Sequence, residues 1–319
     1  MRPHVRVSAL ACVAMIAATP TAAAAQQNEI RPAATSLLGR PLFTPPLDSA
    51  TAKRLRGDLE KALADLAASP DDADRIIWVA RRHGYLGEYE QAIRVLSDGI
   101  RKFPNDARMY RHRGHRYITL RRFAAAVSDL EKAAALMAGK PDEVEPDGQP
   151  NARNIPIGSL QSNVWYHLAL AYYLQGDWNN AIRASREGIA VSSNPDRLVS
   201  QTHWLYMALR NADRDADAAR ALLPIRDDFD IIENHSYYRL VRLYRTGIPR
   251  SVLDSLVSVA AAGTPSDASL AYGIANWFLY TGDTTAAVRA MERIIESPQW
   301  ASFGVIAAEA DLARLRRRR

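Results

Sequence analysis

The chain has 319 residues, of which 48% are hydrophobic and 24% are charged, and its formal net charge at pH 7 is +6. This length suffices for a large core or for one continuous solenoid. The only cysteine is Cys12, which excludes an internal disulfide and a cysteine-ligated metal site.

The first 25 residues form a segment of their own. Arg2 and Arg6 make its start basic, residues 7–18 are apolar but too few to span a bilayer, and small residues follow. This pattern predicts a secretory signal peptide (1–25), so we expect the protein to be exported, either to the periplasm or as a secreted protein. The alternative is a single N-terminal anchor. No later stretch of 18 residues is apolar and uncharged, so we expect no further membrane span.

Prolines mark the next segment, 26–47, at positions 32, 41, 45 and 46. Their density excludes a helix and favours extended chain, which predicts an arm or a linker. A first helix then begins at Asp48 or Ser49 and ends near Ala68. Its leucines recur every three to four residues and form one apolar face, at positions 55, 59, 63 and 66.

From residue 73 the chain repeats a pattern of two amphipathic helices joined by a tight turn. A small residue, Ala92, recurs 34 residues later and then at wider intervals, at Ala126, Ala181, Ala218 and Ala287. Turn-forming sequences precede four of these five alanines, at 87–89, 121–123, 176–178 and 282–284. The pattern predicts about six helix pairs between residues 73 and 300, followed by a capping helix at 302–316. Its weakest part is 199–262, where 203–209 and 216–223 would form the fourth pair and 236–244 and 252–259 the fifth.

The clearest copy reads Trp165-x-x-Leu168-Ala169-x-x-Tyr172, followed by Gly176-Asp-Trp178 and Ala181. This copy closely resembles the tetratricopeptide repeat (TPR), which has a 34-residue period and conserves Trp, Leu-Gly, Tyr, Ala and Pro at these positions. The resemblance implies an all-α fold, a right-handed α-α solenoid of TPR-like pairs over 48–316. It also implies that the first helix of each pair lines a concave face.

The second and third copies are separated by 21 extra residues, which fall within 139–160. This segment contains four prolines and three glycines, which exclude a helix. Acidic residues dominate its first half, and polar ones follow: Asp142, Glu143, Glu145, Asp147, Asn151 and Arg153. Loops of this length inside compact arrays are either functional or disordered, and the sequence leaves both alternatives open.

When the copies are aligned on their recurring alanines, residues at equivalent positions form columns. The resemblance to the tetratricopeptide repeat implies that these columns face a groove. The predicted ligand-binding residues of this groove are Arg81, Arg111, His115, Tyr166, Leu170, His203 and Met207. Guanidinium groups suit carboxylates, phosphates or acidic peptides, and tyrosine adds contact area at low entropic cost. An ordinary charged solvent face is the alternative explanation.

Charge complementarity suggests a sharper form of this hypothesis. The acidic loop would fold into the groove and pair one of its four carboxylates with Arg81, Arg111 or Arg116. The loop would then act as a lid or as a ligand carried by the chain itself.

Catalytic and metal-binding motifs are missing from the sequence. There is no G-x-S-x-G, P-loop, G-x-G-x-x-G or C-x-x-C-H pattern, and we assign no catalytic residue or cofactor. His112 and His115 share a helix face, but no carboxylate motif accompanies them, so we assign no metal.

Most of the basic surplus lies in the final RLRRRR, at 314–319, while the body is close to neutral. A basic tail at 317–319 can contact phosphates or anionic lipid, but a solvated terminus is the favoured explanation. We expect no nucleic acid partner.

The leading hypothesis is an exported TPR-like scaffold that binds a peptide or a partner protein, acidic in character, through its concave face. One alternative is a small-ligand receptor or an enzyme with its site beneath the 139–160 loop, and a closed pocket there would favour it. Another is a scaffold subunit of a cell-envelope complex.

Overall fold

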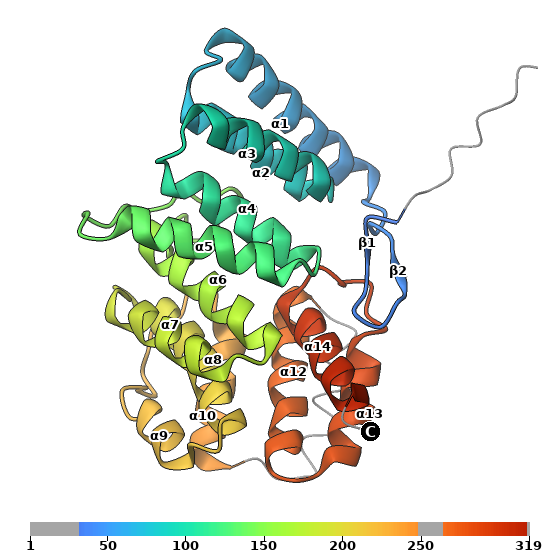
Figure 1. Ribbon diagram of the computed structural model, residues 1–319, viewed down its shortest axis with the longest axis vertical. Coiled ribbons are helices and arrows are strands. Elements are labelled where there is room, and N and C mark those ends of the chain that lie inside the picture. Colours follow the sequence, from blue (N-terminus) through green and yellow to red (C-terminus); the bar gives the residue numbers. More distant parts are fainter. Residues whose placement is uncertain (1–31, 248–263, 318–319) are drawn as a thin grey trace, which may run out of the picture. The chain divides into compact units, whose positions relative to one another are not determined.

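The computed structural model describes residues 32–247 and 264–317, which all belong to one compact unit (Figure 1). The predicted signal peptide, the predicted helix at 252–259 and the last two tail residues lie outside the described residues. No helix in the described part is long and apolar enough to cross a membrane. The elements are β1 (Ala34–Thr35), β2 (Pro41–Leu42), α1 (Ser49–Ala68), α2 (Ala73–Tyr85), α3 (Tyr89–Lys102), α4 (Ala107–Thr119), α5 (Phe123–Met137), α6 (Leu160–Gln175), α7 (Trp178–Ala190), α8 (Pro195–Asn211), α9 (Asp215–Ala221), α10 (His235–Thr246), α12 (Pro265–Tyr280), α13 (Thr284–Ile294) and α14 (Phe303–Arg317).

The first helix of each described pair, α10 excepted, starts at a side chain that caps its free amide groups. Asp72, Asp106, Ser159, Asn194 and Thr264 precede α2, α4, α6, α8 and α12, and each accepts a hydrogen bond from a first-turn N–H. These side chains satisfy donors that a helix start otherwise leaves unpaired. The sequence therefore specifies where these helices begin.

The turn between the two helices of a pair follows one pattern. The residue two positions before the second helix has a positive φ in each case: Gly87, Arg121, Gly176, Asp213 and Gly282, with φ of 77°, 62°, 80°, 56° and 93°. Glycine adopts this left-handed conformation without steric cost, which explains its use at three of the five turns. The five alanines that recur in the sequence then lie at helix crossings, and each is at most 1% exposed.

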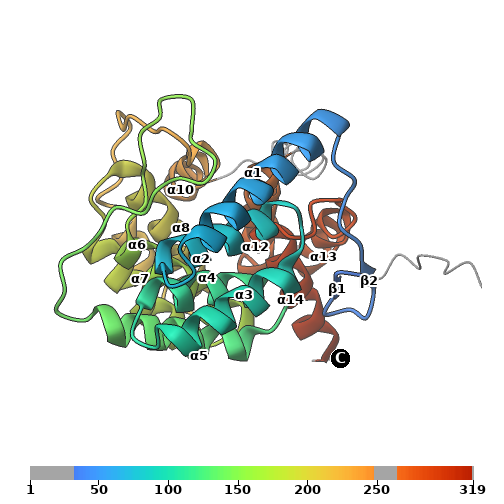
Figure 2. The same cartoon turned by 90° about the horizontal axis from the view of Figure 1, so that it is seen from above.

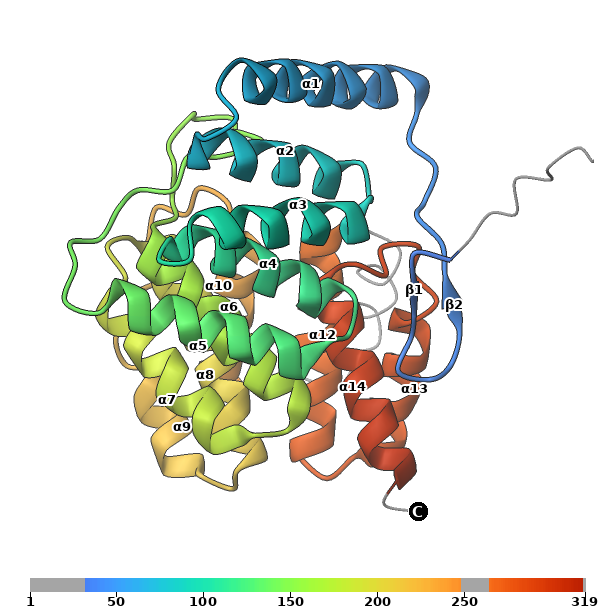
Figure 3. The same ribbon diagram turned by 45° about the horizontal axis from the view of Figure 1, so that its top comes forward.

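Consecutive first helices contact one another, α2 with α4, α4 with α6, and α6 with α8. Five complete pairs are described, α2–α3, α4–α5, α6–α7, α8–α9 and α12–α13. Helix α10 follows α9, and the helix predicted from the sequence to pair with it, at 252–259, lies outside the described residues. This arrangement, visible as stacked pairs in Figures 1 and 3, confirms the predicted α-α solenoid.

The C-terminal helices return onto earlier repeats. Helix α12 contacts α8 and α10, and α14 contacts α6, α12 and α13. A buried ion pair joins α14 to the turn between α4 and α5. Arg121 Nη2 lies 2.8 Å from Glu309 Oε1, and their side chains are 3% and 0% exposed. Arg314, assigned from the sequence to the basic surplus at the C-terminus, instead donates to the carbonyl of Leu174 at 2.8 Å. These helices therefore cover part of the inner face of the repeats.

The arm at the N-terminal end forms a small antiparallel hairpin, in which Ala34 pairs with Leu42 and Thr35 pairs with Pro41. Leu37 N–H donates to Glu309 Oε2 at 3.3 Å, and Trp300 Nε1 donates to the carbonyl of Phe43 at 2.7 Å. The hairpin thus packs against the C-terminal cap.

Candidate functional site

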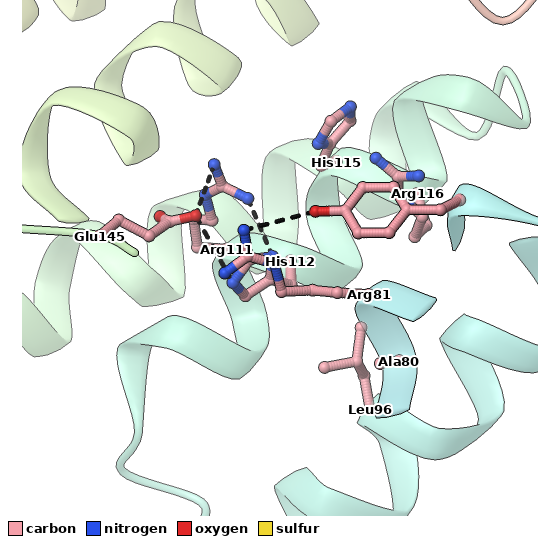
Figure 4. Close-up of a pocket in the computed structure, with 9 residues that line it drawn as sticks. Ala80, Arg81, Leu96, Arg111, His112, His115, Arg116 and Glu145 are labelled. Carbon is pink, nitrogen blue, oxygen red and sulfur yellow. Dashed lines mark hydrogen bonds and ion pairs between the residues drawn. The ribbon is translucent and has the colours of Figure 1, made fainter. Parts of the chain in front are cut away.

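Two adjoining cavities lie among the first helices of the pairs, beneath the 139–160 loop. The smaller one, of about 150 Å³, is lined from α2, α3, α4 and the loop. The larger one, of about 460 Å³, extends to α6, α8, α10, α12 and α14. They share the residues Arg81, Arg111, His115 and Glu145. We refer to the two cavities together as the inner pocket (Figure 4 shows the smaller one).

Three arginines surround the smaller cavity. Arg111 is 8% exposed, and burial lowers its pKa to about 10. Its buried Nε has no hydrogen-bond partner in the described part of the chain. Arg81 lies 4.3 Å from the ring centre of Trp78, and Arg116 lies 5.5 Å from that of Tyr89. Neither Arg81 nor Arg116 forms an ion pair within residues 32–247 and 264–317. The cavity therefore concentrates positive charge.

One loop carboxylate enters this cluster, as Figure 4 shows. Glu145 Oε1 lies 3.0 Å from Arg111 Nη2 and 3.7 Å from His112 Nε2, and Asn163 Nδ2 donates to Glu145 Oε2 at 3.0 Å. Because Arg111 Nη1 donates to His112 Nδ1 at 2.9 Å, the ring proton of His112 belongs on Nε2, which faces Glu145. The pair confirms the predicted contact between the acidic loop and an arginine of the inner face.

A cluster of histidines forms the wall next to the arginines. Burial lowers the pKa of His112, His115 and His167 well below the usual value of 6.5, so the three rings are neutral at pH 7. The rings of His115 and His167 lie 4.4 Å apart, and Phe303 packs on both of them. Within the described residues no group of three or more His, Cys, Asp or Glu side chains is arranged to hold a metal ion. The cluster offers polar and aromatic contacts without adding charge.

The larger cavity combines tyrosines, a fourth arginine and an acidic rim. Tyr166 and Tyr237 share a hydrogen bond between their hydroxyl groups at 2.8 Å. Arg197 Nε donates to the carbonyl of Ile157 at 3.2 Å, which ties the end of the loop to α8. On the rim, burial and then the nearby Glu233 raise the pKa of Asp147. This side of the inner pocket suits a ligand that has both apolar and polar parts.

The structure separates the predicted groove residues into two groups. Arg81, Arg111, His115 and Tyr166 all line the inner pocket. Leu170, His203 and Met207 do not, since each is 0% exposed. The prediction that these three are ligand-binding residues of the groove is wrong, because C-terminal helices pack on the helices that carry them, α10 and α12 on α8 and α14 on α6. His203 contacts the Tyr244 hydroxyl at 3.2 Å, and burial lowers its pKa to about 3.

The loop residues also divide. Glu145 and Asp147 line the inner pocket, whereas Asp142 lies on the surface and accepts a hydrogen bond from Gln161 N–H at 2.9 Å. Glu143 is exposed, and its carboxylate has no hydrogen bond or ion pair in the described part. The remaining two face the segment before α10, where the loop passes in Figure 2: Asn151 donates to Glu233 at 2.7 Å, and Arg153 pairs with Asp230 at 2.8 Å.

Several pocket residues were not among the predicted ones, and Arg197, Tyr237 and Phe303 are three of them. Phe303 belongs to the capping helix, which lies outside the repeat pattern, so no repeat alignment reaches it. Arg197 lies in the first turn of α8, about two turns before His203, the first residue of α8 that the repeat alignment selected.

Residues 163–187, which span most of α6 and α7, match the family model described as Tetratricopeptide repeat. Among curated proteins none matches the chain. Solved structures similar to it include YrrB, described as a TPR protein with an unusual peptide-binding site, at 13% identity and a TM-score of 0.42, covering 75% of this chain and 92% of that one. Another is PilW, described as a type IV pilus biogenesis factor, at 14% identity and a TM-score of 0.44, covering 77% and 86%. These similarities do not bear on function. The family match and the helix pairs that repeat on both sides of it show that the chain contains a tetratricopeptide repeat within an array of similar helix pairs.

Proposed function

We propose that this protein is an exported, non-catalytic scaffold that binds a short acidic segment of a partner peptide or protein in the inner pocket. Export rests on the signal-peptide pattern at 1–25. Binding rests on one observation, the three arginines that surround the smaller cavity with a single carboxylate, Glu145, among them.

The electrostatics of the cavity support an anionic ligand. Arg81 and Arg116 form no ion pair in the described part, and the Nε of Arg111 is buried without a partner. Buried donors and charges without partners cost free energy, so a ligand that supplies acceptors there recovers that cost. Arginine also holds carboxylates with paired, directional hydrogen bonds.

The chain itself provides an example of such a ligand. Glu145 reaches Arg111 from an extended stretch of polypeptide, so a carboxylate borne on a peptide fits this site. The larger cavity next to it offers Tyr166, Tyr237 and Phe303 for neighbouring apolar groups. Because α12 and α14 cover the inner face farther along, the site suits a short segment and not a long helix laid along all the repeats.

A second candidate is a small carboxylate or phosphate ligand. The inner pocket lies beneath the 139–160 loop, as the small-ligand alternative requires, and its larger cavity of about 460 Å³ falls within the range of small-molecule sites, roughly 300–1,000 Å³.

Fluorescence anisotropy with a labelled peptide of alternating Glu and Ala tests the proposal. We expect Arg116→Gln to weaken binding about tenfold, since a charged hydrogen bond contributes about 1.5–3 kcal/mol. The matched control is Arg101→Gln, which removes an exposed arginine of α3 that pairs only with Asp98. Equal losses of affinity in the two variants would contradict the proposal. So would the absence of peptide binding by both the unmodified protein and a Glu145→Gln variant. Citrate that raises the melting temperature, without peptide binding, would favour the second candidate.

A further inference from the structure

We infer that the 139–160 loop is a tethered ligand of the inner pocket, whose Glu145 occupies the carboxylate site and must be displaced when a partner binds. The inference rests on the proposed function, since it assigns the same site to a partner. It adds that the protein regulates access to this site with its own chain.

The position of Glu145 is that of a bound ligand. Its carboxylate is held by side chains of α4 and α6, namely Arg111, His112 and Asn163, and not by its own loop. The side chain of Glu145 is 14% exposed and that of Arg111 is 9% exposed, so the contact is largely shielded from water. Donors fixed on two helices hold any carboxylate placed between them in the same way.

Beyond Glu145, the middle of the loop is held by a few hydrogen bonds: Arg82 Nη1 donates to the carbonyl of Gly148 at 3.4 Å, and Asn151 donates to Glu233 at 2.7 Å. Val144 and Ile155 remain 68% and 42% exposed, so their displacement exposes little further apolar surface, whereas Ile157, 8% exposed, belongs to the base of the loop. The outer tether between Arg153 and Asp230 is a surface ion pair, with side chains 47% and 74% exposed. Such pairs contribute about 0–1 kcal/mol. Glu145 is therefore the main polar anchor of the loop in the inner pocket.

The base of the loop is held more firmly. Glu145 N–H donates to the carbonyl of Gly158 at 2.9 Å, and Leu160 N–H donates to that of Glu143 at 2.8 Å. These bonds place Glu145 next to a fixed point of the backbone, at the start of α6. The carboxylate stays close to Arg111 at a high effective concentration, as a tethered competitor does.

Gly148 shows how closely the loop approaches α2. A Cβ atom added at this position would lie 1.6 Å from the hydroxyl oxygen of Tyr85 and 2.8 Å from Arg81 Nη2. An alanine at position 148 therefore makes the loop, or the ends of the Tyr85 and Arg81 side chains, move apart. Gly148→Ala loosens the contact of the loop with α2 while Arg111 stays in place.

The test measures anisotropy with the labelled Glu-Ala peptide for the unmodified protein and three variants. Glu145→Gln removes the competing carboxylate and Gly148→Ala loosens the loop, so each should tighten binding about tenfold or more. The control, Glu143→Gln, makes the same change of charge in the same loop at an exposed position without a partner and should leave the affinity unchanged.

The outcomes separate the two proposals. If the unmodified protein binds and both loop variants bind equally or more weakly, the loop is not a competitor, and the proposed function stands without it. If no variant binds the peptide, the proposed function fails, and the inference fails with it. If Glu145→Gln does not fold, the affinity of Gly148→Ala alone decides: tighter binding supports the inference, and equal or weaker binding contradicts it.

Discussion

Replacement of Glu309 by Gln tests how the C-terminal helix is held over the inner face of the repeats. In the folded protein the Glu309 carboxylate accepts hydrogen bonds from Arg121 Nε at 3.1 Å and Nη2 at 2.8 Å, and from Leu37 N–H at 3.3 Å. Its side chain is fully buried, so no water replaces these contacts. The substitution keeps the shape of the side chain and removes its charge.

The expected loss of stability follows from the charge that remains. With a neutral amide in place of the carboxylate, Arg121 stays buried without a counter-charge, and breaking a buried pair in this way costs about 3–5 kcal/mol of unfolding free energy. Removal of both partners, in the double variant Arg121→Met with Glu309→Met, leaves no buried charge. The double variant should therefore recover a large part of that loss.

Urea unfolding, extrapolated to water, measures these free energies. The control is Arg153→Gln, which breaks an exposed ion pair and should change stability by less than about 1 kcal/mol. A loss below about 1 kcal/mol for Glu309→Gln would refute the reasoning. So would a double variant whose loss equals the sum of the losses of the two single variants.

Two further predictions concern the interior. Gly304→Ala should destabilise the protein by at least about 3 kcal/mol in urea unfolding, because the new Cβ would lie 2.2 Å from the carbonyl oxygen of Ala268. The control, Gly57→Ala, adds a Cβ in open space on α1 and should stabilise the protein by roughly 1 kcal/mol. Equal effects of the two substitutions would contradict the close packing of α14 on α12. Stability should also fall with pH below about 6.5. The buried histidines have lowered pKa values, so below about pH 6.5 the unfolded chain binds protons that the folded protein does not. Each such histidine then lowers the free energy of unfolding by about 1.4 kcal/mol per pH unit. The loss of stability begins near the ordinary histidine pKa of 6.5 and, for His203, continues down to its lowered pKa of about 3. Urea midpoints that stay constant between about pH 7 and pH 5 would contradict it.

Much of the fold was predictable from the sequence because its signals are local. The alanines at the crossings, the turns at Gly87, Gly176 and Gly282, and the caps of the first helices depend on neighbouring residues only. The same signals do not report what covers a helix face. Leu170, His203 and Met207 occupy the aligned columns, yet they are buried, because α10 and α12 pack on α8 and α14 packs on α6.

The candidate site was predictable in part. Charge complementarity indicated a contact between the acidic loop and an arginine, and Glu145 with Arg111 forms it. Which of the four carboxylates pairs with Arg111 depends on the backbone pairing of Glu145 with Gly158, which no local pattern reveals. Phe303 reaches the site from the end of the chain, and only the folded structure brings it there.

A crystal structure of the protein with the Glu-Ala peptide tests most directly the claim that the inner pocket is the ligand site. We expect a peptide carboxylate in the inner pocket, with an oxygen within about 3 Å of a guanidinium nitrogen of Arg111 or Arg116. A peptide bound on the outer helices α3, α5 or α7, with the inner pocket unchanged, would contradict the account.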